Sequence, residues 1–97
     1  MTATSVVQHV TVYFTGYVQG VGFRYSARRI AHEFEVTGFV KNLSDGRLQL
    51  EVVGAPAEID GFIAAIEERM HGHIRMTERL GAVAGATSTN FSGFEIR

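Results

Sequence analysis

Cysteine is absent from the chain, and its absence removes several classes of function at once. A chain without cysteine forms no disulfide bond, holds no zinc through thiolates and has no thiol nucleophile. A dense positive charge is missing as well, because 9 lysines and arginines stand against 10 aspartates and glutamates, with no basic block. Proteins that bind nucleic acid over a broad surface carry such a basic patch, so we expect no nucleic-acid partner. Any anion that binds must be held locally, in a pocket.

Long apolar stretches and a targeting segment are also lacking. No run approaches the roughly 18 apolar residues that a membrane span requires, so we expect no membrane partner. Residues 1–5 are short and polar and do not resemble a secretory signal, which predicts a cytoplasmic protein. The length of 97 residues predicts a single domain over 1–97, and a hydrophobic content of 45% is typical of a globular core.

Alternating apolar residues predict strands. Val10, Val12 and Phe14 fall on one side of the 7–15 segment, which is the period of a half-buried strand. The pair Asp45-Gly46 stands between two further apolar segments and favours a tight hairpin. The C-terminal segment alternates again, whereas the 74–86 segment is weakly patterned and ends in small residues. The predicted strands are 7–15, 38–42, 47–53 and 91–97.

Apolar residues at helical spacing predict two helices. The first begins near Phe23 and ends before Gly38, with Phe34 on its apolar side. The second begins at Pro56, because proline suits the first helical turn, and it ends near Gly72. The order is then strand, helix, strand, strand, helix, strand, with room for one additional short strand. This is the α+β, ferredoxin-like βαββαβ arrangement, in which two helices cover one face of an antiparallel sheet.

Closely spaced glycines join the first predicted strand to the first predicted helix. The segment 16–24 reads Gly-Tyr-Val-Gln-Gly-Val-Gly-Phe-Arg. Glycine allows the backbone to turn several N–H groups inward, the start of a helix adds unpaired amides, and Arg24 adds a full positive charge. This pattern indicates an anion site, with phosphate as the favoured guest. Taken alone, the same residues also fit a simple strand-to-helix turn beside a surface arginine.

Asn42 ends a predicted strand directly before the hairpin turn. Asparagine at such a position is most often a turn former, because its side chain binds nearby backbone groups. Its amide can also donate and accept at once, which is what a group that orients water toward a phosphoryl group must do. The residues leave both interpretations open. His71 and His73 lack a matching carboxylate or cysteine cluster, so we expect no metal site there.

The loop and the hairpin together resemble the paired signatures of the acylphosphatase family. The first signature is the 16–24 segment, and the second reads Gly-Phe-Val-Lys-Asn over 38–42 and continues through Asp45-Gly46. The resemblance covers nearly the whole chain, from about Val10 to the ending Gly-Phe-Glu-Ile at 93–96.

This resemblance implies a hydrolase that cleaves the carboxyl–phosphate bond of small acyl phosphates by direct attack of water, without metal or cofactor. In the family, the arginine of the first signature binds the substrate phosphate and the asparagine of the second positions the water. These roles fall on Arg24 and Asn42. The implied phosphate-binding residues are Gln19, Gly20, Val21, Gly22, Phe23 and Arg24. We also expect one acylphosphatase-like domain that acts as a monomer, with 1–6 as a loose N-terminal extension.

Two positions depart from the family pattern. Tyr17 stands where a basic residue is common, and Phe39 stands where tryptophan is frequent. The alternative function is a non-catalytic module that binds a phosphate ligand or regulates through it, since the same fold serves many purposes. A structural relative with impaired activity is a further alternative.

Overall fold

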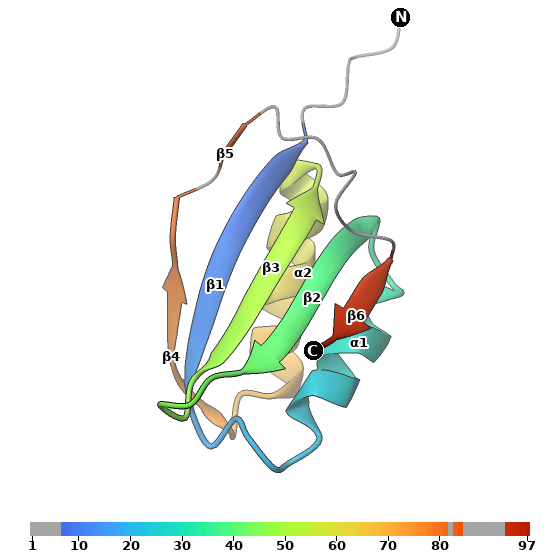
Figure 1. Ribbon diagram of the computed structural model, residues 1–97. Helices are drawn as coiled ribbons and strands as arrows, with labels where there is room; N and C mark the ends of the chain where they lie inside the picture. The colour runs from blue at the N-terminus through green and yellow to red at the C-terminus, as the bar shows by residue number, and fades with distance from the viewer. Residues whose placement is uncertain (1–6, 82, 85–92) are drawn as a thin grey trace, which may run out of the picture.

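One mixed sheet backed by two helices forms the molecule in the computed structural model, which describes residues 7–81, 83–84 and 93–97 (Figure 1). The strands are β1 (Gln8–Gly16), β2 (Val36–Asn42), β3 (Leu48–Gly54), β4 (Ile74–Arg79), β5 (Val83–Ala84) and β6 (Phe94–Ile96), and the helices are α1 (Phe23–Ala31) and α2 (Pro56–Arg69). The expected extension at 1–6 lies outside the described residues, as does part of the segment rich in small residues.

The order of the strands in the sheet is β4-β1-β3-β2-β6, and β5 pairs with the start of β1. The first four strands and both helices follow one another as βαββαβ, which confirms the predicted ferredoxin-like fold. One pairing differs from the expectation of an antiparallel sheet, because β6 runs parallel to β2. Figure 1 shows both helices behind the sheet, with α1 next to β2 and β6 and with α2 behind β3. Among the described residues, the helices thus cover one face of the sheet and leave the other face open.

The apolar core lies between the sheet and the helices. Val10, Val12 and Phe14 of β1 are fully buried, as their alternation predicts. The register sets them opposite Val52, Leu50 and Leu48 of β3, which are fully buried too. From α1 and α2 the buried residues that complete this core are Phe23, Ala27, Ile30, Ala31, Ile59, Phe62, Ile63 and Ile66. The core thus fixes the start of α1 and the direction of β2, which frame the site described below.

The first helix is shorter than its apolar spacing predicts. It ends at Ala31, and the amides of the next three residues bond to carbonyls three positions back, which tightens the chain into a turn. Phe34 still packs on the core, with its ring centroid 6.1 Å from that of Phe62. The turn leaves β2 free to begin at Val36, two residues before the predicted start.

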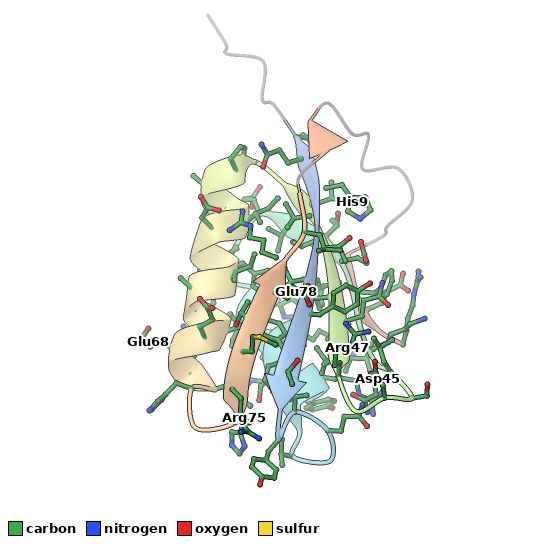
Figure 2. The ribbon with its side chains drawn as sticks, turned by 90° about the vertical axis from the view of Figure 1, so that its left-hand side faces the viewer. His9, Asp45, Arg47, Glu68, Arg75 and Glu78 are labelled. Atoms are coloured by element: carbon green, nitrogen blue, oxygen red, sulfur yellow. The ribbon has the colours of Figure 1, made fainter. Side chains whose placement is uncertain are left out.

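The open face of the sheet is polar at its centre. Glu51 is only 8% exposed there, and its carboxylate accepts hydrogen bonds from Thr11 and Gln49 and lies 2.6 Å from the His9 ring. Figure 2 shows His9 and Arg47 on the side of the sheet away from α2. Neither helix among the described residues has the length and apolar character needed to cross a membrane.

Candidate active site

The loop between β1 and α1 is held at both of its ends. Tyr17 donates its amide to the His73 carbonyl at 2.8 Å, which ties the start of the loop to the start of β4. Val18, only 1% exposed, anchors the loop in the core. Gly20 and Gly22 then take φ of +77° and +76°, the left-handed region that favours glycine over residues with a Cβ. The glycines therefore shape the loop, as their spacing predicts.

The amides of this loop are available to a ligand. Among the described residues, no backbone amide from Gln19 to Phe23 donates a hydrogen bond to another backbone group. The first turn of α1 contains no acidic residue, so no carboxylate of this turn neutralises the positive end of the helix dipole. Phe23 is buried and holds this end of the helix against the core. The arrangement can bind an anion through main-chain donors.

A pocket of about 380 Å³ opens between this loop, the end of β2 and β6. Arg24 and Asn42 both line it, so the fold brings the two predicted catalytic residues together. Of the predicted phosphate-binding residues, Gln19 and Val21 do not line it. Among the described residues, the lining is formed by Val18, Gly20, Gly22, Phe23, Arg24, Tyr25, Asn42 and Ile96. No acidic side chain is among these residues, and the local charge comes from arginine.

Arg24 is held in the pocket wall by Arg97, the residue that follows β6. The Nη1 of Arg24 donates to a main-chain oxygen of Arg97 at 3.1 Å. The amide of Arg97 in turn donates to Val40 of β2 at 2.8 Å. Arg24 is only partly exposed, and its guanidinium keeps further donors for a ligand, since arginine carries five N–H groups in a planar fork. A contact 73 residues away in sequence thus orients the cation.

Asn42 faces the helix side of the sheet. Like Val40 two residues earlier, it belongs to the set of β2 residues that alternate toward the core, and it pairs with Leu48 of β3. Its Oδ1 is buried and accepts no hydrogen bond from the described residues. Buried polar atoms nearly always have a partner, so an unpaired acceptor in a pocket wall suits a water or a ligand group.

The hairpin turn does not depend on the Asn42 side chain. The Leu43 amide donates to the Arg47 carbonyl at 2.8 Å, and the Gly46 amide donates to the Leu43 carbonyl at 3.2 Å. Gly46 has a φ of +93°. Asp45 accepts from the amide of Arg47 at 3.0 Å and from its Nε at 2.8 Å. These bonds hold the pKa of the Asp45 carboxyl below its ordinary value, with the backbone amide of Arg47 as the main cause. Other groups therefore make the hydrogen bonds of the turn, and the structure gives the Asn42 side chain no part in forming it.

Gln19 links the two halves of the site by its side chain. Its Nε2 donates to the carbonyls of Leu43 at 2.8 Å and Arg47 at 2.9 Å, the residues that begin and end the turn after Asn42. The sequence suggested Gln19 only as part of a phosphate-binding loop. No local pattern reveals a bond between residues 24 and 28 positions apart. The side chain is thus a tether between the loop and the hairpin.

The histidine pair lies apart from this pocket. His73 contributes its carbonyl to the loop, and His71 lines a different depression beside β4. Within the part of the chain that the structure describes, no three histidine, cysteine, aspartate or glutamate side chains gather as a metal site would require.

The family model described as Acylphosphatase matches residues 10–96. A relative named acylphosphatase from Archaeoglobus fulgidus is 41% identical over 85 residues, which cover 88% of this chain and 92% of the relative. The fold is similar to the structure of an acylphosphatase from Coxiella burnetii, with a TM-score of 0.62 and 29% identity over 95% of this chain and 94% of that one. The crystal structure of acylphosphatase from Bacillus subtilis shares the fold with a TM-score of 0.71 and 24% identity, over 93% of this chain and 98% of that one.

Proposed function

The chain belongs to the acylphosphatase family, and we propose that it hydrolyses the carboxyl–phosphate bond of small acyl phosphates in the pocket between the 17–22 loop and the end of β2. The observation that carries this proposal is the meeting of Arg24, Asn42 and unpaired loop amides at one cavity. These groups supply charge, fixed donors and an acceptor, which are the parts that phosphoryl transfer to water uses.

The loop amides and Arg24 bind the non-bridging phosphate oxygens. Phosphoryl transfer passes through a loose transition state whose charge spreads over these oxygens, so donors fixed in advance stabilise it. Gly20 and Gly22 permit the backbone to approach the phosphate closely, because no Cβ intervenes. The hydrogen bond from Arg24 to Arg97 limits the rotamers of the guanidinium and orients it before substrate arrives.

Asn42 holds the attacking water. Its unpaired Oδ1 accepts a hydrogen bond from the water and leaves a lone pair of the water oxygen directed at phosphorus. The new bond forms between the water oxygen and phosphorus, and the bond between phosphorus and the acyl oxygen breaks. The electron pair leaves with the carboxylate, and the protons of the water remain with the phosphate and the solvent. A carboxylate is a weak base that departs without a proton, so the site needs no general acid.

Hydrolysis of benzoyl phosphate by the purified chain tests this scheme. Arg24→Ala removes a charged donor from the transition state, and we expect kcat/KM to fall by about 10²- to 10³-fold, with a higher KM and a lower kcat. Asn42→Ala should lower kcat with little change in KM, because the phosphate contacts remain. Arg29→Ala is the matched control, since Arg29 lies on the same helix but outside the pocket.

The same assay separates the alternatives. Tight, Arg24-dependent binding of inorganic phosphate without turnover would favour a binding or regulatory module. Turnover that survives EDTA is expected from the metal-free scheme, and turnover lost in EDTA and restored by a divalent cation would contradict it. We also propose that the chain acts as a monomer, and we expect activity per mole to be independent of protein concentration.

A further inference from the structure

Tyr25 lines the pocket but has no part in the phosphate contacts described above. It follows Arg24 in the first turn of α1 and is 62% exposed. Tyr17, at 74%, is more exposed still but does not line the pocket. Tyr25 is thus an exposed aromatic residue among those that line an anion site.

Arg28 holds this ring in place. It lies one helical turn after Tyr25, and its guanidinium carbon stands 4.9 Å from the ring centroid, which is a cation–π contact. A ring packed on one side loses rotamer freedom before a ligand arrives, so less entropy is lost when its other side is covered. The contact therefore prepares the ring for stacking.

The geometry of the substrate brings its acyl group to this part of the pocket. When the loop amides and Arg24 hold the phosphoryl oxygens, the acyl carbon lies only two bonds from phosphorus and must point away from the amides. Besides Tyr25, the remaining wall includes the apolar side chains of Val18, Phe23 and Ile96. No acidic group among the lining residues would attract a cationic acyl group. The available surface is apolar and partly flat.

We propose that Tyr25 is a specificity residue that stacks on the acyl group, and that the preferred substrates are acyl phosphates with a planar, aromatic acyl group. This inference rests on the proposed function. Aromatic stacking adds a contact that a methyl group cannot make, so the preference for benzoyl over acetyl phosphate should depend on the ring of Tyr25.

The test compares kcat/KM for benzoyl phosphate and acetyl phosphate in four forms of the chain. Tyr25→Ala should lower kcat/KM for benzoyl phosphate by about threefold to tenfold and should change that for acetyl phosphate by less than about twofold. Tyr25→Phe should keep the native ratio of kcat/KM for benzoyl phosphate to kcat/KM for acetyl phosphate, because the proposed contact is made by the ring and not by the hydroxyl. Tyr17→Ala is the matched control and should also keep the ratio.

Equal losses on both substrates would overturn the inference, because they would mean that Tyr25 only supports the start of α1. An unchanged ratio in Tyr25→Ala would overturn it as well. If the native chain hydrolyses neither substrate, the proposed function fails, and calorimetry then decides the inference separately. Phenacylphosphonate and acetonylphosphonate carry CH₂ in place of the bridging oxygen and are not hydrolysed. If the native chain binds phenacylphosphonate more tightly than acetonylphosphonate and Tyr25→Ala removes this difference, the ring contact is supported. If Tyr25→Ala binds phenacylphosphonate as tightly as the native chain does, the ring contact is refuted.

Discussion

Replacing Gln19 should disconnect the proposed phosphate-binding loop, residues 17–22, from the strand that carries Asn42. The two hydrogen bonds of Gln19 Nε2, at 2.8 and 2.9 Å, reach the carbonyls on either side of the hairpin turn. Leu43, one of the two acceptors, directly follows Asn42 in the chain. Gln19→Ala removes both bonds and leaves two carbonyl groups to find other donors. The change acts on geometry, because the loop amides, Arg24 and Asn42 all remain.

The size of the effect follows from these two bonds. A hydrogen bond contributes about 1 kcal/mol net, so the loss of both lowers the free energy of unfolding by about 2 kcal/mol. For a domain of this length, that corresponds to a decrease in Tm of about 8 to 16 °C. A displacement of about 1 Å at a reacting group can lower a rate by about 100-fold, so we expect kcat to fall by between about 10-fold and 100-fold. KM should change little because the phosphate contacts persist.

The assay combines initial rates of benzoyl phosphate hydrolysis with thermal unfolding followed by circular dichroism. Gln19→Glu has nearly the same shape but offers only acceptors to the two carbonyls, so it should be at least as impaired as Gln19→Ala. Gln8→Ala is the matched control, because Gln8 is a partly buried glutamine of β1, away from the pocket.

A double-mutant cycle with Asn42→Ala decides whether Gln19 acts through Asn42. If it does, the loss of kcat in the double variant is close to that of Asn42→Ala alone, because the residue to be positioned is already gone. Fully additive losses would refute this coupling. A Gln19→Ala variant with native kcat and native Tm would refute the whole argument.

Further predictions concern the sheet and the turn. Gly38→Ala should unfold the chain or lower Tm strongly in thermal unfolding, because a Cβ at this position, at φ of +148°, would overlap the Glu51 carbonyl. Gly72→Ala is the control and should lower Tm only slightly, because its Cβ would meet no atom within 4 Å. Glu51→Ala should destabilise the chain by about 1 to 3 kcal/mol in urea unfolding, because it removes the carboxylate that accepts hydrogen bonds from the partly buried side chains of Thr11 and Gln49. Asp45→Asn should destabilise near neutral pH, and the difference from the native chain should vanish as pH falls through the pKa of Asp45, which the contacts with Arg47 hold below its ordinary 3.8.

The fold could be predicted from the sequence where local pattern and tertiary packing agree. The strand around Val12 has the buried face that its alternating residues predict, and Gly46 has the left-handed φ that the Asp45-Gly46 turn predicts. Both features depend on residues that are neighbours in the sequence, so a local pattern reveals them. The end of α1 could not be read this way. Phe34 has helical spacing to Ile30, yet it reaches the core from a turn, since packing against Phe62 satisfies the same apolar pattern without a helix.

The main residues of the candidate site could be predicted from the sequence, but the contacts that hold them in place could not. Arg24 and Asn42 were expected together from the paired signatures, and one pocket contains both. The tether from Gln19, the carbonyl of Arg97 on Arg24 and the ring of Tyr25 were not expected. The first two are bonds between distant parts of the chain, and the third depends on the direction of one exposed side chain. None of these leaves a periodic trace in the sequence.

The direction of Asn42 depends on the register of β2, and that register depends on a glycine at the other end of the strand. Side chains alternate along a strand, so a slip of one residue would turn Asn42 from the helix side to the open face. Gly38 pairs with Val52 so closely that only a residue without Cβ fits beside the backbone of β3. Any other residue of the strand placed at this point would clash, so the close approach excludes the slipped pairings. The glycine that the strand requires for packing therefore also fixes the side of the sheet on which the Asn42 amide, the proposed water ligand, lies.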